Sequence, residues 1–105
     1  MLLGLDIGTS RTKAVLMDAA GCEVATATVP TPFATTDGRV EMPVAALHDC
    51  LGEVLAGLGD RRRQVVAAGV AGIAESGAPL DPAGRALAPV IAWHDERGGE
   101  AVALL

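Results

Sequence analysis

Short apolar runs alternate with turn residues over the first third of the chain. Residues 2–7 and 13–17 are apolar except at isolated positions and flank the polar corner 8–12, so they predict two antiparallel strands. Residues 22–29 alternate between two sets of positions after the turn-forming pair Ala20-Gly21, which predicts a third strand beside the second. We therefore expect the chain to begin with three antiparallel strands.

A helical pattern follows these strands. Apolar residues recur at three- and four-residue spacing over residues 43–58, where Pro43 suits the first helical position and Gly59 ends the pattern. The preceding residues 30–41 carry Pro, Thr, Asp and Gly, and no change in composition follows them. They predict a loop within one domain, which leads into a single helix.

Two further apolar runs lie in the second half of the chain. Residues 65–74 contain only apolar residues and glycine and predict a fourth strand that is buried and central, and residues 89–93 predict a short strand after the turn 81–84. The order strand, strand, strand, helix, strand predicts an α/β fold with a mixed sheet and helices packed on it. Residues 100–105 begin a helical pattern without a C-terminal glycine or a basic last turn, so we expect the natural sequence to continue.

The composition is typical of a small folded domain with an aliphatic core. The chain has 105 residues, of which 50% are hydrophobic and 20% are charged, and this length allows one domain or less. Tyr is absent, and Phe33 and Trp93 are the only aromatic residues. We therefore expect Ala, Val, Leu and Ile to fill the core.

The charge and the cysteines limit the expected partners and compartment. A net charge of −5 argues against a nucleic-acid or anionic membrane surface, and the basic run 61–63 has no interleaved aromatic residues. Cys22 and Cys50 form neither a CxxC motif nor a dense disulfide framework, which favours a reducing compartment. The N-terminus lacks the features of a signal peptide, and no apolar run is long enough for a membrane helix. We expect a cytoplasmic protein that binds neither nucleic acid nor membranes.

The corner between the first two strands gathers residues that suit a phosphate. Gly8 allows a tight turn whose backbone N–H groups can converge on an anion, and Thr9 and Ser10 add hydroxyl donors. Lys13 adds a positive charge. Asp6 would need a cation beside a phosphate, and Mg²⁺ held through water or one carboxylate suits that position. The alternative is that Asp6 and Thr9 cap a hairpin turn and Lys13 is a solvated strand end.

This corner lies in a longer stretch that resembles a known motif. Residues 4–18, GLDIGTSRTKAVLMD, are similar to the first phosphate motif of the superfamily of actin, sugar kinases and heat-shock ATPases. Residues 69–97, GVAGIAESGAPLDPAGRALAPVIAWHDER, and the stretch GRVEMP before the helix resemble the N-terminal domain of the FGGY carbohydrate kinases. The resemblance covers nearly the whole chain.

The resemblance implies a fold and a place in a larger protein. The expected fold is an α/β fold of the ribonuclease H-like (actin-like ATPase) class, with a mixed sheet and flanking helices, here incomplete. Residues 1–105 would form the N-terminal portion of the first kinase domain, as a fragment of a longer chain.

The resemblance also implies a role for each residue of the corner. Asp6 falls on the metal-associated acid of the family, which would bind Mg²⁺ through water. Gly8, Thr9 and Ser10 fall on the turn that faces the phosphates of ATP. Lys13 falls on the basic position that approaches the terminal phosphates. ATP and Mg²⁺ are therefore the expected cofactors.

The second motif implies part of a sugar pocket. Glu75 falls where glycerol kinase has an acid that holds substrate hydroxyls, and we expect its neighbour Ser76 to bind substrate with it. Trp93 falls on a tryptophan at the sugar pocket, and Asp95 falls on the acid of the xylulokinase Trp-Asn-Asp stretch, which is Trp-His-Asp here. An acid that accepts hydroxyl protons and a ring that covers C–H edges suit a sugar or polyol.

Departures from the family pattern leave the identity of the sugar open. Ala74 stands where glycerol kinase has an arginine, and residues 73–75 read Ile-Ala-Glu where xylulokinase has Gln-Met-His. The residues also have purely structural interpretations. Trp93 could be a core residue, Glu75 a solvated strand end, and Asp95 the N-cap of a helix.

The implied activity is transfer of the terminal phosphoryl group of ATP to a sugar or polyol hydroxyl. In the family the catalytic aspartate, the adenosine site and the second domain lie downstream, so we expect no catalytic base in this chain and no activity from it alone. The expected partners are the sugar, the remainder of the kinase chain and a second copy in a homodimer. The alternatives are an actin-type or heat-shock-type ATPase without a sugar site, and a short non-catalytic binding module.

Overall fold

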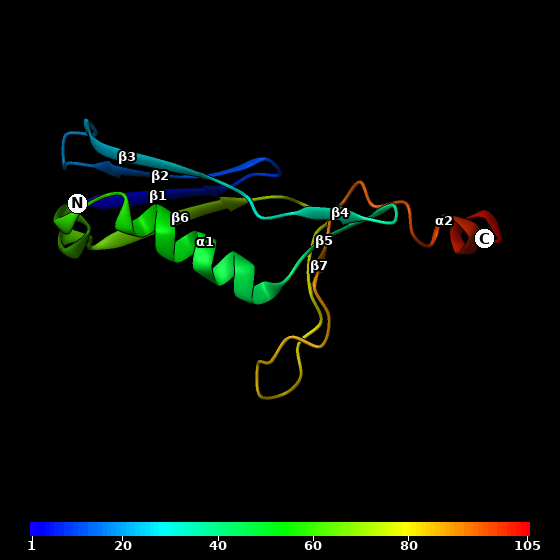
Figure 1. Ribbon diagram of the computed structural model, residues 1–105. Helices are drawn as coiled ribbons and strands as arrows, with labels where there is room; N and C mark the ends of the chain where they lie inside the picture. The colour runs from blue at the N-terminus through cyan, green and yellow to red at the C-terminus, as the bar shows by residue number, and fades with distance from the viewer.

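Four strands form the larger of two sheets. The computed structural model describes residues 1–105 and places β1 (Leu2–Ile7), β2 (Arg11–Met17), β3 (Glu23–Pro30) and β6 (Ala67–Gly72) in the order β3-β2-β1-β6 (Figure 1). β2 pairs antiparallel with both β1 and β3, whereas β6 runs parallel to β1. The three leading antiparallel strands and the mixed α/β sheet predicted from the sequence are confirmed.

The position of strand β6 in the sheet differs from the one predicted from the sequence. The prediction of a buried, central strand is wrong, because β6 pairs only with β1 and all six of its residues are exposed. The helix that covers the sheet packs against β2 and β3 and leaves β6 uncovered. A run of Ala, Gly and Val is compatible with an edge strand or a central strand, so the composition of β6 does not predict how many strands flank it.

A second, smaller sheet occupies part of the stretch that was predicted to be a loop. β4 (Ala34–Thr36) and β5 (Arg39–Met42) form an antiparallel hairpin, so the prediction of a loop over residues 30–41 is wrong. Asp37 and Gly38 connect the two strands with φ values of 50° and 76°. Two positive φ values in a two-residue connection are typical of a type I′ turn, for which Asp-Gly is a preferred sequence.

The predicted strand over residues 89–93 is present in a shortened form and joins the small sheet. β7 (Val90–Ile91) pairs antiparallel with β5, which gives the order β4-β5-β7. Ala92 extends this contact, since its N–H donates to the carbonyl of Val40 at 3.0 Å. The small sheet therefore fixes the chain immediately before Trp93.

One long helix covers the larger sheet. α1 (Val44–Ala56) follows Pro43, which is the N-cap rather than the first helical residue, and it ends before Gly57 instead of at Gly59. Its predicted existence and position are confirmed, with boundaries that shift by one or two residues. A Cβ at Gly57 would lie 2.8 Å from the Ala27 side chain, so the close approach of the helix end to β3 requires glycine.

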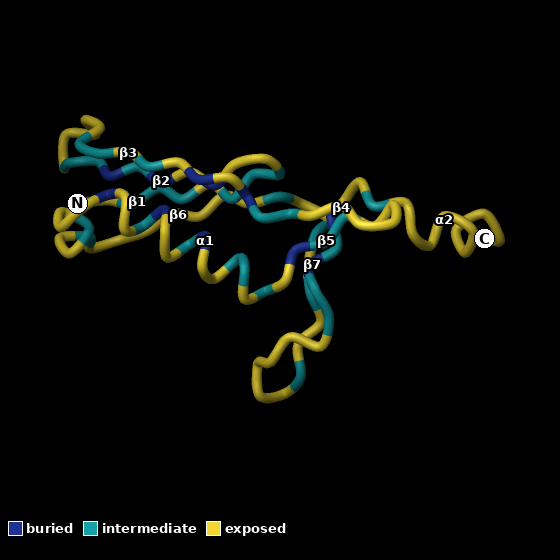
Figure 2. Tube along the Cα trace, in the orientation of Figure 1, coloured by how far each residue is buried: buried dark blue, intermediate teal, exposed yellow.

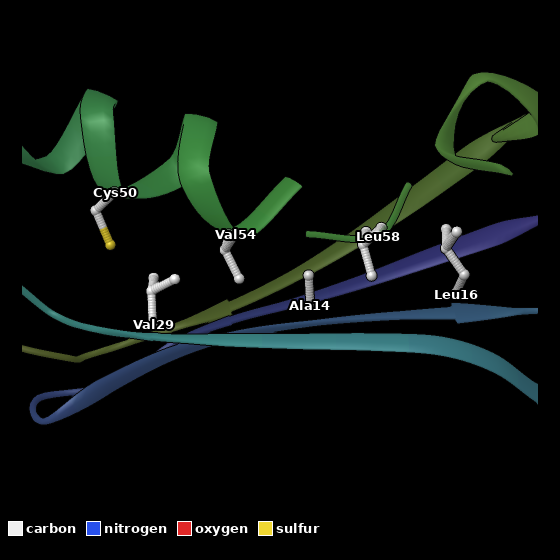
Figure 3. Packing of buried hydrophobic residues seen from close by; sticks show 6 residues of the cluster. All are labelled: Ala14, Leu16, Val29, Cys50, Val54 and Leu58. Carbon is white, nitrogen blue, oxygen red and sulfur yellow. The ribbon is translucent and has the colours of Figure 1, made fainter. Parts of the chain in front are cut away.

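The core between α1 and the sheet is aliphatic, as the composition predicted. Figure 3 shows side chains from α1 pointing toward side chains from β2 and β3. The six buried members of this cluster are Ala14, Leu16, Val29, Cys50, Val54 and Leu58. Alternation in β2 puts Thr12, Ala14 and Leu16 on the covered face, which leaves Arg11, Lys13 and Val15 on the open face.

The rest of the chain is short elements and exposed connections. η1 (Asp60–Gln64) is a 3-10 helix that contains the basic run 61–63, and α2 (Gly99–Ala103) occupies most of the predicted C-terminal helical stretch. Figure 2 shows that the buried segments lie between α1 and the sheet and around β5 and β7, whereas the C-terminal end is exposed. None of the helices has the length and apolarity needed to cross a membrane.

Candidate phosphate and sugar site

The turn between β1 and β2 is closed by its own backbone. The N–H of Gly8 donates to the carbonyl of Arg11 at 3.0 Å, so this amide is already used and does not face a ligand. A Cβ at Gly8 would lie 2.8 Å from that same carbonyl oxygen, a backbone atom that cannot move aside. Glycine is therefore required here by close approach of the chain to itself.

Two buried hydroxyl groups hold the turn from the covered side. Thr31 Oγ1 donates to the carbonyl of Gly8 at 2.7 Å, and it lies 3.0 Å from Thr12 Oγ1. Because the single hydroxyl proton of Thr31 goes to Gly8, Thr12 must be the donor in the second bond. The N–H of Thr31 also donates to the carbonyl of Ser10 at 3.0 Å, so the chain after β3 is fastened to both sides of the turn.

Neither of these threonines was predicted from the sequence to belong to the site. Their side chains are buried, with Thr12 0% and Thr31 7% exposed. The available signal was the alternation in β2, which puts the Thr12 hydroxyl at a core position one residue before Lys13. A buried hydroxyl needs a hydrogen-bond partner, and the partner of Thr12 is Thr31, whose own hydroxyl donates to Gly8 in the turn.

Asp6 and Lys13 lie opposite each other on the open face of the sheet. They are paired residues in the β1–β2 register, and both are exposed. Neither side chain forms an ion pair. They line a hollow of ≈590 Å³ that crosses all four strands on the face that α1 leaves open. The exposed charges are therefore available to a ligand.

The donor set at Asp6 fits a magnesium ion that accompanies a phosphate. No group of three or more His, Cys, Asp or Glu side chains gathers anywhere in the chain, so a metal held at Asp6 would have at most two protein ligands of these types. Mg²⁺ is commonly bound by one or two carboxylates together with waters and substrate phosphates. The solvent-facing carboxylate of Asp6 meets that requirement.

The segment that follows β6 comes to the same edge of the sheet as the turn. β1 and β6 are parallel, and the N–H of Ile73 donates to the carbonyl of Ile7 at 3.0 Å just beyond the paired strands. Glu75 follows with a φ of 61°, a left-handed conformation that is unusual for a residue with a side chain. Its side chain is exposed. Local strain of this kind is frequent at ligand-binding positions.

Trp93 directly connects the two predicted half-sites, which are the turn between β1 and β2 on the phosphate side and the segment with Glu75 and Ser76 on the sugar side. Its backbone N–H donates to Ser76 Oγ at 3.0 Å, and its indole Nε1–H donates to Thr9 Oγ1 at 3.3 Å. The interpretation of Trp93 as a core residue is wrong, because it is 56% exposed. The ring packs edge-on against His94, with centroids 5.1 Å apart. Trp93 thus lies on the surface next to the phosphate turn.

Asp95 occupies a different environment from the one predicted for a sugar ligand. Its side chain is 0% exposed, and both of its oxygens accept hydrogen bonds. Oδ1 accepts from the backbone N–H and Nε–H of Arg97, and Oδ2 accepts from Arg97 Nη2 and the N–H of Val40. This geometry argues against direct contact between Asp95 and a sugar. Nor is Asp95 a helix N-cap, since Gly98 has that position in α2.

The surroundings of Asp95 stabilise its charged form. Hydrogen bonds from the side chain of Arg97 hold the pKa of Asp95 well below its ordinary value, and bonds from backbone N–H groups act in the same direction against the opposing effect of burial. Arg97 also pairs with Glu41, and its two carboxylate partners raise the pKa of the guanidinium. The group ties the segment after Trp93 to β5.

Asp81 is a turn-forming residue, as the predicted turn over residues 81–84 suggested. Its Oδ1 accepts from the backbone N–H groups of Ala83 and Arg85, and its Oδ2 accepts from Arg85 Nε. The backbone and side-chain hydrogen bonds from Arg85 are the main reason why the pKa of Asp81 is lowered. Both carboxylate oxygens of Asp81 therefore have their hydrogen-bond partners within the same loop.

The chain resembles known carbohydrate kinases along its whole length. Residues 1–105 match the sequence model described as the FGGY family of carbohydrate kinases, N-terminal domain. The chain is 34% identical over 98 residues to the xylulose kinase of Streptomyces coelicolor. The matched region covers 92% of this chain and 20% of that protein.

Solved structures share the fold. A xylulose kinase from Rhodospirillum rubrum matches with a TM-score of 0.83 and 34% identity over 97% of this chain and 22% of its own. A gluconate kinase from Lactobacillus acidophilus matches with a TM-score of 0.82 and 25% identity over 97% of this chain and 21% of its own. The chain thus spans about a fifth of the length of these relatives. Their likeness confirms the actin-like ATPase fold, and the chain belongs to the FGGY family of carbohydrate kinases, to whose N-terminal domain it corresponds.

Proposed function

We propose that this chain works as the N-terminal portion of an ATP-dependent kinase that phosphorylates a hydroxyl of a sugar or polyol. The observation that carries the proposal is the hydrogen bond from Trp93, on the sugar side, to Thr9, on the phosphate side. Phosphoryl transfer depends mainly on placing the acceptor hydroxyl next to the terminal phosphate. Through this contact the Trp93 side chain would border both the sugar and the phosphates.

The phosphates of ATP would bind at the β1–β2 turn. Thr9 and Ser10 offer hydroxyl groups, and Lys13 offers an unpaired positive charge next to Asp6. A magnesium ion at Asp6 would neutralise part of the charge of the phosphates. We expect a residue elsewhere in the complete kinase to accept the proton of the acceptor hydroxyl, as the resemblance to the family implies.

The sugar would bind along Glu75, Ser76 and Trp93. The exposed carboxylate of Glu75 can accept hydroxyl protons, and the exposed face of Trp93 can cover the C–H edges of a sugar ring or chain. Ser76 already accepts from the N–H of Trp93, so its hydroxyl proton is free for a substrate oxygen. Asp95 ties the segment after Trp93 to β5 through its hydrogen bonds with Val40 and Arg97.

A panel of sugars tests the proposal. The complete kinase is incubated with Mg²⁺ and ATP, and ADP release is measured with and without xylulose, gluconate, glycerol and other polyols. Xylulose comes first because the Streptomyces coelicolor relative is a xylulose kinase. We expect one of the compounds to stimulate ADP release and to be recovered as a phosphate ester. ATP hydrolysis that no sugar stimulates would favour a non-kinase ATPase instead.

The family match favours a sugar kinase over the chaperone and filament branches of the same fold. It also argues against a stand-alone binding module, because the whole chain matches the N-terminal domain of a kinase family. A cytoplasmic location, a homodimer and the absence of activity in the isolated chain remain predictions.

A further inference from the structure

The contact between Trp93 and Thr9 joins residues that are 84 positions apart in the sequence. Each partner stands on backbone that is held in place. Trp93 is preceded by Ala92, which is 3% exposed and bonded to Val40, and its own N–H is bonded to Ser76. On the other side, the turn that carries Thr9 is fastened by Thr31. The two side chains therefore meet without either backbone having to be ordered by a ligand.

The direction of the hydrogen bond determines what Thr9 can do next. An indole N–H is only a donor, so Thr9 Oγ1 is the acceptor, and its hydroxyl proton remains available. Donation into a hydroxyl oxygen polarises the O–H bond and makes it a better donor. The occupied lone pair also restricts the directions in which that proton can point. Trp93 thus prepares the Thr9 hydroxyl to donate to an anion at the turn.

We infer that Trp93 is a positioning residue for phosphoryl transfer, which orients the hydroxyl of Thr9 toward the phosphates while its ring forms the wall of the sugar site. The inference rests on the proposed function and goes beyond it. It assigns the coupling between the two half-sites to the side chain of Trp93. A sugar that packs against the indole ring contacts the same side chain whose N–H orients the Thr9 hydroxyl.

A double-mutant cycle in the complete kinase tests this coupling. Trp93→Phe keeps an aromatic face for the sugar and removes the indole N–H, and Thr9→Val removes the hydroxyl with little change in shape. We expect Trp93→Phe to lower kcat by about 2- to 10-fold, the equivalent of one hydrogen bond, while the KM for the sugar changes less than about twofold. In the Thr9→Val background, Trp93→Phe should have no further effect on kcat.

Thr9→Ser is the matched control, because it retains the hydroxyl. In that background Trp93→Phe should again lower kcat by about 2- to 10-fold. Unchanged melting temperatures would show that each variant is folded, which is expected because Trp93 is largely exposed.

Two results would overturn the inference. The first is a change in sugar KM with kcat unaffected, which would make Trp93 a sugar wall and nothing more. The second is an equal effect of Trp93→Phe in the presence and absence of the Thr9 hydroxyl. A wild-type enzyme that transfers no phosphate to any sugar would overturn the proposed function as well, so the two failures are distinguishable.

Discussion

Thr31 donates its hydroxyl proton to the carbonyl of Gly8 at 2.7 Å, across 23 residues of sequence. The bond comes from a buried side chain outside residues 4–18, and it holds the first residue of the turn between β1 and β2. The position of the turn therefore depends on the segment after β3 as well as on the motif itself.

Replacing Thr31 by Val should destabilise the chain. The substitution keeps the shape of the side chain and leaves the Gly8 carbonyl and the Thr12 hydroxyl without their partner. We expect the free energy of unfolding, measured with urea, to fall by about 1–3 kcal/mol. Thr31→Ser preserves the hydroxyl and should cost clearly less. Equal losses for the two variants would show that the methyl group matters and the hydrogen bond does not.

Val54 should be a major contributor to the core. Its side chain is 0% exposed between α1 and the sheet, where no aromatic residue shares the packing. We expect Val54→Ala to lower the free energy of unfolding by about 2 kcal/mol, because it leaves a cavity. Val66→Ala is the matched control at an 83% exposed position, and it should change stability by less than about 0.5 kcal/mol. Similar effects at both positions would contradict the packing of α1 on the sheet.

We expect Glu75 to contribute to substrate binding while it lowers the stability of the chain. Its φ of 61° is unfavourable for Glu and favours glycine, so we expect Glu75→Gly to stabilise the chain by about 0.5–1 kcal/mol. The neighbouring Ala74→Gly, where φ is not positive, should be destabilising. In the complete kinase, Glu75→Gly should raise the sugar KM by about 10- to 100-fold through loss of a charged acceptor. An unchanged KM would remove Glu75 from the sugar site.

Asp95 should make the stability of the chain sensitive to acid. Its pKa in the folded chain lies well below 3.8, the ordinary value, chiefly because of the Arg97 side chain. The unfolded chain thus binds the proton more tightly, so this contribution to stability is complete above the ordinary pKa and is lost as the pH falls toward the folded-state value. Asp95→Asn should be less stable near neutral pH.

Urea unfolding at a series of pH values measures this effect. Wild type should lose more stability than Asp95→Asn as the pH falls below 3.8. Asp60→Asn is a control at a side chain that is 92% exposed and should follow the wild-type curve. Parallel curves for wild type and Asp95→Asn would show that the Arg97 contact does not control the ionisation of Asp95.

The local patterns predicted most of the elements but not their neighbours. Alternation and turn residues predicted β1, β2 and β3, and the three- and four-residue spacing predicted α1. Strand β6 was placed wrongly because the number of strands that flank it depends on the rest of the sheet. The β4–β5 hairpin was missed because its strands are short and exposed, although Asp37-Gly38 is a strong turn signal.

The candidate site was predicted in part for a similar reason. The phosphate corner is one contiguous stretch, so its residues could be assigned from a single motif. The contacts from Thr31 to Gly8 and from Trp93 to Thr9 join distant segments, and no local pattern encodes them. Asp95 was assigned to the sugar by resemblance, whereas its partners Val40 and Arg97 become visible only when β5 and the Trp93 segment are seen together.

The central claim is that the β1–β2 corner of this chain supports phosphoryl transfer from ATP to a sugar. The most direct test compares the complete kinase with its Asp6→Ala variant, using ³¹P NMR to follow sugar phosphate formation and calorimetry to measure sugar binding. We predict that Asp6→Ala lowers the rate of transfer by about 100-fold or more, while the sugar still binds with nearly unchanged affinity. Transfer that continues at the wild-type rate in the variant, or sugar binding that disappears with Asp6, would contradict the account.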